Sequence, residues 1–271
     1  MADVIVLGSL NIDLVARVGH LPSPGESVTA VDFLQRPGGK GANQAAAAAR
    51  AGASTRLIGC VGADDEGTMY RNALKTHSVD VCGVRAVSGE VTGRALIVVD
   101  CAGENHIVVV PGANGFTGEP EVRALHLRPD DVLLLQHEVP APTVRAAARA
   151  AREAGCTVLL NPSPWRGLDR VLFDDCDALI VSVGEAERLR DEGYDTSRAI
   201  ITAGGEGASW GDLHVDAAHV AVLDTTGAGD AFAGTLAAAL AQGRDRDAAL
   251  HAGVAAGGRA VMHEGAQPWS F

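Results

Sequence analysis

Aromatic side chains are scarce in this chain of 271 residues: they make up 4% of it, although 47% of its residues are hydrophobic. We therefore expect a sizeable core built from alanine, valine and leucine. Basic residues are also few, with 22 lysines and arginines against 34 acidic residues, which leaves a net charge of -12. Because nucleic-acid binding needs clustered lysine and arginine, this charge argues against a nucleic-acid partner. It does not exclude a phosphorylated small molecule, whose charge backbone amides and a metal ion can neutralise locally.

Cysteine is rare too, and the five cysteines are scattered without any Cys-x-x-Cys pair. An odd, scattered set predicts reduced thiols in a cytoplasmic protein. The early Asp3 and the strand that follows it exclude a secretory leader, and no apolar run is long enough to span a bilayer. We therefore expect no membrane partner. The nine histidines lack the spacing of a zinc site.

Strand-like hydrophobic runs alternate along the chain with alanine-rich helical runs. The clearest predicted strands are 4–8, 56–60, 131–136, 157–160, 178–181 and 199–202, and the clearest predicted helices are 42–51, 65–77, 141–154 and 185–192. This alternation predicts an α/β fold with a mostly parallel central sheet that helices cover on both faces. The length fits one such domain over residues 1–271 with a small appendage.

Two segments, 14–36 and 91–110, break this rhythm. They hold the short extended runs 14–18, 27–33, 93–99 and 106–110, which follow one another without an intervening helix. Such strands cannot belong to the parallel sheet, whose crossovers need a longer connection. We predict that they form a small antiparallel β-lid inserted into the domain.

The most informative motif is Gly227-Ala228-Gly229-Asp230, directly ahead of a predicted helix at 231–242. The amides of residues 227–229 would be unpaired at the helix N-terminus, where they can gather around an anion. A carboxylate in the first turn would repel a phosphate that is merely bound. It suits a base that takes a proton from a hydroxyl attacking that phosphate. The alternative is an ordinary glycine turn with an acidic helix start.

Two further polar clusters lie in the N-terminal part of the chain. The glycine-rich run 38–44 opens the alanine-rich helix, but it lacks the Gly-x-x-x-x-Gly-Lys-Ser/Thr spacing of a phosphate-binding loop. The buried strand 4–8 runs into Asn11 and Asp13. These two side chains point the same way on an extended chain and suit a pair of adjacent sugar hydroxyls.

Six motifs in order give the chain a resemblance to the PfkB carbohydrate kinases, most of all to the ribokinases among them. They are Asn11-x-Asp13, Pro24-Gly25-Glu26, the run 38–45, Asn161-Pro162-x-Pro164, Asp224-Thr225-x-Gly227-Ala228-Gly229-Asp230 and Gly265-Ala266-Gln267-Pro268. The resemblance implies a ribokinase-like three-layer sandwich, a β-lid that closes over the sugar, and a homodimer formed through the lid.

The resemblance also implies roles for single residues. Asp230 would be the general base, and the amides of Gly227, Ala228 and Gly229 would form the anion hole. The sugar would be held by Asn11, Asp13, Gly39, Lys40, Asn43 and Glu138, with the attacking hydroxyl at Asp230. From the residues alone, Lys40 could equally be a solvated loop lysine and Glu138 a helix-start acid.

The nucleotide half matches the family less closely. The resemblance implies that Ser182, Thr202, Gly204, Gly207 and Gly229 bind the nucleotide. The family's Asn-x-x-Glu motif organises magnesium through water, and it falls at Ser182 and Glu185, so that serine replaces the asparagine. The segment 190–198 is shorter than in ribokinases, and the sequence stops at 271, before theirs does. We expect these differences to weaken nucleotide binding more than sugar binding.

A monovalent-cation site is implied beside the anion hole. It would be built mainly from carbonyl oxygens, at Asp224, Thr226, Ala260, His263 and Gly265. Asp224 would supply the charged ligand, although a strand-end acid of no special role is an alternative.

The activity implied by the resemblance is phosphorylation of the primary hydroxyl of D-ribose to D-ribose 5-phosphate, with ATP as donor, Mg²⁺ as cofactor and K⁺ as activator. Two alternatives stay open. One is a related kinase for another pentose, deoxyribose, fructose or a nucleoside. The other is a degenerate member that binds sugar or nucleotide without turnover.

Overall fold

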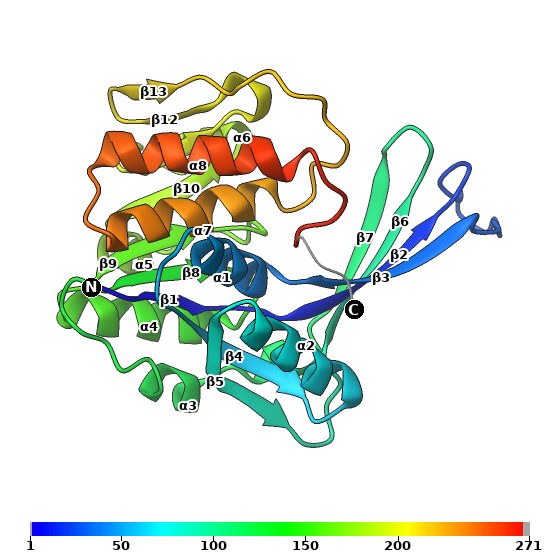
Figure 1. Cartoon of the computed structure of the whole chain (residues 1–271), viewed down its shortest axis with the longest axis horizontal. Helices are drawn as coiled ribbons and strands as arrows, with labels where there is room; N and C mark the ends of the chain where they lie inside the picture. The colour runs from blue at the N-terminus through cyan, green and yellow to red at the C-terminus, as the bar shows by residue number, and fades with distance from the viewer. Residues whose placement is uncertain (1, 268–271) are drawn as a thin grey trace.

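A nine-stranded sheet runs through the part of the chain that the computed structural model describes, residues 2–267 (Figure 1). Its order is β13-β12-β11-β10-β9-β8-β1-β4-β5. The strands are β1 (Val4–Leu7), β4 (Thr55–Gly62), β5 (Val79–Val87), β8 (Val132–Gln136), β9 (Thr157–Asn161), β10 (Ala178–Ser182), β11 (Ala199–Thr202), β12 (Ala208–Trp210) and β13 (Leu213–Val215). The pairings from β11 to β5 are parallel, and β12 and β13 add an antiparallel hairpin at one edge. The predicted, mostly parallel sheet is confirmed.

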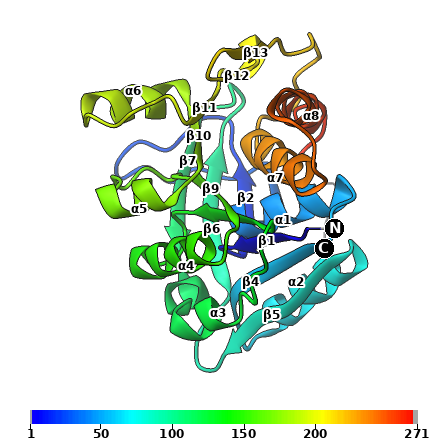
Figure 2. The same cartoon turned by 90° about the vertical axis from the view of Figure 1, so that its left-hand side faces the viewer.

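Helices cover both faces of this sheet (Figure 2). One face carries α1 (Lys40–Arg50), α2 (Asp65–Thr76), α7 (Ala228–Ala241) and α8 (Arg246–Ala260), and the other carries α3 (Glu119–Arg123), α4 (Ala141–Glu153), α5 (Arg170–Asp175) and α6 (Val183–Asp191). Every residue of β1 is fully buried between the two layers. Because both faces are covered, the central strands read as continuous apolar runs. The three-layer fold is therefore confirmed. Among the described residues, no helix is both long enough and apolar enough to cross a membrane.

A second sheet of four strands extends away from the main body (Figure 1) and is the predicted lid. It consists of β2 (Asn11–Arg17), β3 (Asp32–Gly38), β6 (Gly93–Val99) and β7 (Asn105–Val110), in the order β3-β2-β6-β7. The two outer pairs are antiparallel, as predicted. The central pair, β2 and β6, is parallel, which the sequence did not indicate.

One lid strand lies elsewhere than the sequence predicts. The prediction of a strand at 27–33 is wrong, because β3 runs from Asp32 to Gly38. The register of β2 explains the shift, since Asn11 pairs with Gly38 and Arg17 with Asp32. β3 contains Pro37, which is tolerated because β3 is an edge strand.

The order of the strands reverses between β8 and β1, and this places a crevice there. The chain leaves β1 for β4 and β5 on one side and later returns to β8 on the other. Ligands of open α/β sheets bind outside the carboxyl ends of strands at such a switch point. Ser9 follows β1 and Glu138 follows β8, and the Ser9 hydroxyl donates to Glu138 Oε2 at 2.5 Å.

Candidate active site

The N-terminus of α7 carries the Gly-Ala-Gly-Asp motif. The helix begins at Ala228, three residues before the predicted start, and Gly227 precedes it in a left-handed conformation with φ of 75°. One detail of the prediction is wrong: the Ala228 amide is not free, because it donates to Thr225 O at 3.2 Å and closes a turn. Among the described residues, the amides of Gly227 and Gly229 have no hydrogen-bond partner. Two amides rather than three are thus available to an anion.

Asp230 is almost fully buried in the first turn of α7, and two amides from α1 hold its carboxylate. Asn43 Nδ2 donates to Oδ2 at 3.0 Å, and Gln44 Nε2 donates to Oδ1 at 2.9 Å. Small residues let the two helices approach this closely, since a Cβ on Gly234 would lie 2.1 Å from the Gln44 carbonyl oxygen. A carboxylate has about four lone-pair positions, so Asp230 keeps acceptor capacity for a substrate hydroxyl.

A buried chain of amides extends from this carboxylate into the sheet, and the sequence reasoning did not assign it to the site. Gln136 Nε2 at the end of β8 donates to Gln44 Oε1 at 2.6 Å, and Gln44 Nε2 lies 3.3 Å from Asn161 Oδ1 at the end of β9. Polar residues at the ends of apolar strands were the signal that could have revealed it. The chain fixes the orientation of Gln44 and therefore of the Asp230 carboxylate.

On its other side, Asn43 is held by the C-terminal motif. Gln267 Nε2 donates to Asn43 Oδ1 at 2.7 Å and also to the Tyr70 hydroxyl at 2.6 Å. That hydroxyl donates to Gly38 O at 2.7 Å. These bonds explain why the motif at 265–267 accompanies the glycine-rich run, while its last residue, Pro268, lies outside the described residues.

Charged groups predicted to hold the sugar gather in front of Asp230. The Lys40 amide donates to Glu138 Oε2 at 3.0 Å, which joins the start of α1 to the end of β8. Burial, together with the charges of Glu138 and Asp230, raises the pKa of Asp13 to about 7. Asp230 above all raises the pKa of Lys40 against the effect of burial. Lys40 is half-buried at the start of α1, and its charged neighbours are the carboxylates of Asp230, Glu138 and Glu185. It is therefore not a solvated loop residue.

The remaining two predicted sugar residues meet where the lid joins the main body. Gly39 adopts φ of 87°, and a Cβ there would lie 2.6 Å from the Asn11 amide nitrogen. Asn114, on the 3₁₀ helix Gly112–Phe116, donates through Nδ2 to Asn11 Oδ1 at 2.8 Å. Asn11 and Glu138 line a common cavity of about 140 Å³ with Val109 of the lid. The structure thus brings the predicted sugar residues together at the crevice.

A larger cavity of about 320 Å³ lies beside the start of α7 and contains most of the predicted nucleotide residues. Thr202, Gly204, Gly207 and Gly229 line it. Its other walls are largely apolar and come from the loop 217–222, α7 and α8. Such an apolar wall suits the flat face of a nucleobase.

Ser182 does not line that cavity. Its hydroxyl and amide both donate to Glu185 Oε2, at 2.9 and 2.8 Å, and the Glu185 amide donates back to the hydroxyl at 3.3 Å. This is a capping box at the start of α6. Among the described residues, Glu185 Oε1 has no hydrogen-bond partner. In the part of the chain that the structure describes, no helix fills 192–198 between α6 and β11.

The residues predicted to bind a monovalent cation lie on two adjacent segments. Asp224 accepts from the Thr226 amide and from the Gly265 amide, both at 2.8 Å. Burial alone would raise the pKa of Asp224, but these hydrogen bonds keep it below its usual value. Ala260 and His263 lie with Gly265 along the second segment. Among the described residues, no three His, Cys, Asp or Glu side chains gather as a metal site. A cation here would depend on carbonyl oxygens.

Comparison with known proteins identifies the family. Residues 1–270 match the model of the pfkB family carbohydrate kinases. The chain belongs to the pfkB family. It is 36% identical over 286 residues to a ribokinase of Haemophilus influenzae, an alignment that covers 97% of this chain and 93% of the relative.

Solved structures of ribokinases have the same fold. A ribokinase of Thermotoga maritima is 31% identical and superposes with a TM-score of 0.87, over 98% of this chain and 95% of that one. A ribokinase of Arabidopsis thaliana, solved with ribose and ATP, is 28% identical with a TM-score of 0.86, over 99% of this chain and 96% of that one. As a pfkB carbohydrate kinase, the chain is a phosphotransferase with an alcohol group as acceptor.

Proposed function

We propose that this pfkB kinase transfers the γ-phosphoryl group of ATP to the primary hydroxyl of D-ribose and releases D-ribose 5-phosphate. The observation that carries the proposal is the position of Asp230. Its buried carboxylate lies between the charged cluster of Asp13, Lys40 and Glu138 and the cavity that Gly229 lines. Relatives of known substrate support it, since the curated matches include ribokinases and one structural match holds ribose and ATP.

The sugar would occupy the crevice at the reversal of strand order. Asn11 and Asp13, two apart on β2, present one amide and one carboxyl group to adjacent hydroxyls. Glu138 and Lys40 approach from the main body. Asn43 would contact the end of the sugar that carries the primary hydroxyl, because its amide already touches Asp230. A pentose with several hydroxyls satisfies this many polar groups better than an apolar acceptor does.

The chemistry follows from this placement. The hydroxyl oxygen attacks the γ-phosphorus and loses its proton to Asp230, while the bond from that phosphorus to the bridging oxygen breaks and ADP leaves. Deprotonation is needed only as the new bond forms, so position matters more than basicity. The amides of Gly227 and Gly229 stabilise the charge on the transferring group. Asn43 and Gln44 hold the carboxylate in one orientation.

Two cations are part of the proposal. Glu185 would hold Mg²⁺ through water by the carboxylate oxygen that Ser182 leaves free. K⁺ would be held by oxygens of Asp224, Thr226, Ala260, His263 and Gly265. The Asp224–Gly265 hydrogen bond shows that the two segments are adjacent. When bound, Mg²⁺ neutralises phosphate charge and K⁺ supplies positive potential near the start of α7.

We also propose that residues 14–36 and 91–110 close over the sugar as one lid and pair with the lid of a second copy. A closed lid would exclude water from the transferring phosphoryl group.

The test is a coupled assay of ADP release with ribose, deoxyribose, fructose and a nucleoside, each with and without K⁺. The proposal expects the highest kcat/KM with ribose and stimulation by K⁺. A higher kcat/KM with another acceptor would reassign the substrate. ADP release with none of them, from protein that binds ribose in calorimetry, would identify a non-catalytic member.

A further inference from the structure

Asn114 is a buried side chain that none of the sequence motifs includes, and only 1% of it is exposed. It belongs to the 3₁₀ helix Gly112–Phe116, which follows the lid strand β7. Its side chain makes three hydrogen bonds, all to the two residues at which the chain passes from β1 into the lid. Nδ2 donates to Leu10 O at 3.0 Å and to Asn11 Oδ1 at 2.8 Å, and Oδ1 accepts from the Leu10 amide at 2.9 Å.

These bonds leave one orientation to each of the two asparagine side chains. The Leu10 N–H can only donate and the Leu10 carbonyl can only accept, so the backbone decides which end of the Asn114 amide is oxygen and which is nitrogen. Asn114 Nδ2 in turn can only donate, so the atom of Asn11 that it meets must be the carbonyl oxygen. The orientation of Asn11 is thus set by the backbone of Leu10, through Asn114.

The free end of Asn11 is therefore its NH₂ group. Among the described residues, Asn11 Nδ2 has no hydrogen-bond partner. Asn11 lines the crevice cavity of about 140 Å³, and Asp13 lies two positions further along the same strand. Alternate residues of a strand lie on one face, so a group that can only donate stands beside a carboxylate that can only accept. A hydroxyl fits such a pair, because its oxygen accepts from the amide while its proton goes to the carboxylate.

Gly93 leaves the space for the contact between the two asparagines. It pairs with Asn11 at the start of β6. A Cβ on residue 93 would lie 2.1 Å from Asn114 Nδ2 and 2.4 Å from Asn11 Oδ1, closer than non-bonded atoms approach. Any larger residue would push the two amides apart, so the contact requires glycine at this point of the lid.

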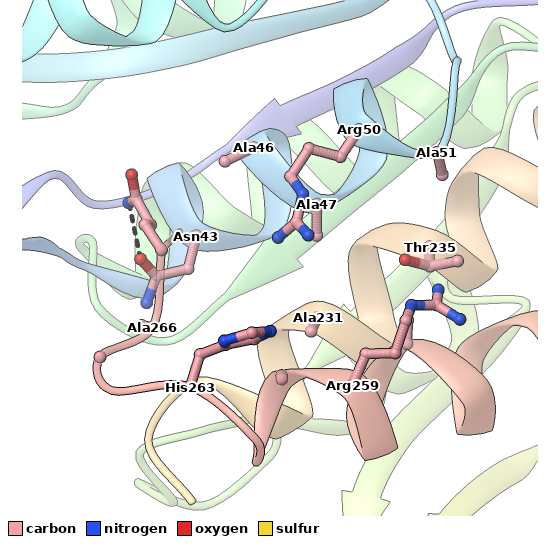
Figure 3. A pocket seen from close by; sticks show the side chains of 14 residues that line it. Asn43, Ala46, Ala47, Arg50, Ala51, Ala231, Thr235, Arg259, His263 and Ala266 are labelled. Carbon is pink, nitrogen blue, oxygen red and sulfur yellow. Dashed lines mark hydrogen bonds between the residues drawn. The ribbon is translucent and has the colours of Figure 1, made fainter. Parts of the chain in front are cut away.

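The site holds a second asparagine in the same way. Gln267 Nε2 donates to Asn43 Oδ1 at 2.7 Å (dashed line in Figure 3), and Asn43 Nδ2 is left to donate to Asp230. In both cases a buried amide occupies the oxygen of the asparagine, which then presents its NH₂ group as a donor. For Asn43 the acceptor is a protein carboxylate. For Asn11 the described part of the chain supplies none, which leaves this donor to a ligand in the crevice.

We propose that Asn114 is a positioning residue for the acceptor sugar and acts through Asn11. By occupying Asn11 Oδ1 it makes Asn11 a donor toward the crevice, and the sugar hydroxyl bound there accepts from Asn11 and donates to the Asp13 carboxylate. The inference rests on the proposed function in one respect, that the crevice holds a sugar.

The experiment is calorimetric titration of ribose into the full chain at pH 8, with wild type, Asn11→Ala, Asn114→Ala and the double variant. Asn114→Ala frees Asn11 to turn its oxygen toward the sugar, so we expect the Kd for ribose to rise about tenfold, the effect of one lost hydrogen bond. In Asn11→Ala there is no side chain left to orient. The double variant should therefore bind ribose within about twofold of Asn11→Ala, whereas two independent effects would multiply.

Steady-state kinetics give a second readout. In the described part of the chain, Asn114 forms no hydrogen bond with Asp230 and does not line the cavity beside α7. The KM for ribose should therefore rise in Asn114→Ala, while kcat and the KM for ATP stay within about twofold.

Thr143→Val is the matched control. Thr143 donates to Thr117 O at 2.8 Å, directly after the same 3₁₀ helix. The change removes a buried hydrogen bond that anchors this helix and leaves Asn114 in place, so ribose should bind as it does to wild type.

Three results would overturn the proposal: wild-type affinity in Asn114→Ala, multiplied losses in the double variant, or an equal loss in Thr143→Val. Thermal unfolding checks that the variants fold. If Asn114→Ala does not fold, Gly93→Ala takes its place in the same comparison, since its methyl group separates the two amides and removes no polar group. Calorimetry needs no turnover, so a protein that shows this pattern without phosphorylating ribose would refute the proposed function and leave the role of Asn114 standing.

Discussion

The proposed chemistry of this kinase depends on one buried carboxylate whose surroundings come from distant parts of the chain. Asp230 lies at the start of α7, but both of its oxygens are held from α1, by residues more than 180 positions earlier in the sequence. Because Asn43 and Gln44 donate to it, the carboxylate has a fixed orientation and still accepts a further proton. This distinguishes it from an acid that only begins a helix.

Replacing Asp230 by asparagine is expected to abolish phosphorylation while ribose affinity stays within a few-fold. The two side chains have nearly the same shape, so the change removes the base; the asparagine oxygen still accepts one of the hydrogen bonds from Asn43 and Gln44, and the other is lost. We expect a loss in kcat of about 10²- to 10⁴-fold, the usual contribution of a general base. Steady-state kinetics and calorimetry measure the two effects. Asp245→Asn, at the N-cap of α8, is the matched control, because asparagine caps as well as aspartate and turnover should not change. If the Asp230→Asn variant kept a tenth or more of wild-type turnover, Asp230 would not be the general base.

We expect the stability of the free protein to depend on pH through Asp13. Burial first, and then Glu138 and Asp230, raise its pKa to about 7, whereas an unfolded aspartate releases its proton near 3.8. Between these values the native state holds more protons than the unfolded state, so the free energy of unfolding should fall as pH rises from 4 to 7, by up to roughly 4 kcal/mol. Denaturant unfolding of wild type and Asp13→Asn measures this. The variant should lose the slope and be the more stable protein at pH 8.

The same variant should bind ribose more weakly. A charge-assisted hydrogen bond contributes about 1.5–3 kcal/mol, so we expect at least about a tenfold rise in Kd for ribose with no change for ATP. Equal losses for the two ligands would point to a folding defect instead.

The sequence predicted the polar residues of the site itself better than the buried residues that hold them in place. Asp230, Asn43 and Lys40 stand in motifs, and the structure brings them together. Gln136 and Tyr70 stand in no such run, and their partners Gln44 and Gln267 are 92 and 197 positions away. A buried glutamine at the end of an apolar strand becomes informative only when the tertiary fold supplies the group it bonds.

At the scale of elements, apolar periodicity predicted the central strands because both of their faces are buried. It predicted most helices because each buries one face against the sheet. It failed at β3, where Pro37 belongs to a strand, and at the parallel pairing of β2 with β6. Both features depend on register between segments far apart in sequence. The packing of α1 against α7, in contrast, depends on small residues within the helices themselves. The alanine tract of α1 and Gly234 of α7 set how closely the two helices approach.

The start of α6 gives a prediction at this scale. We expect wild type to have a raised KM for ATP and a demand for free magnesium, and Ser182→Asn to lower both in part. An amide reaches further than a hydroxyl toward phosphate or metal-bound water, and asparagine caps a helix as well as serine does. Ser182→Ala is the control: it should cost about 1 kcal/mol of stability through the lost cap and should not improve either constant. Kinetics across ATP and free magnesium measure the effect, and identical profiles for wild type and Ser182→Asn would place residue 182 outside the nucleotide site.

For the whole molecule, the two sheets contribute different parts of the proposed site. The main sheet positions the start of α7 and the cavity of about 320 Å³ beside it, and the lid contributes Asn11 and Asp13 from its strand β2. Ion pairs from Arg17 and Arg36 of the lid to Glu264 tie the lid to the segment after α8. The lid is thus connected both to the sugar crevice and to the segment that holds Gln267.

The lid has one face toward this crevice and one away from it, and the outer face is mostly apolar. Asp13 pairs with Ala95, which pairs with Val109, and Val109 lines the crevice. Neighbouring positions on each strand therefore point outward. They include Phe33, Leu96 and Val108, which are 60%, 43% and 60% exposed. Such a patch rarely remains uncovered in a soluble monomer.

We therefore expect the kinase to form a homodimer through the outer faces of two lids, and a charge placed there to break it. Val108→Lys would bury an ammonium group in an apolar interface and should weaken dimerisation at least about tenfold. Ile107→Lys, on the next residue of the same strand, is the matched control: it points to the opposite face, and the dimer should persist. Sedimentation equilibrium at micromolar concentration measures both. A monomeric wild type, or a Val108→Lys protein that dimerises as tightly as wild type, would show that this face is not the interface.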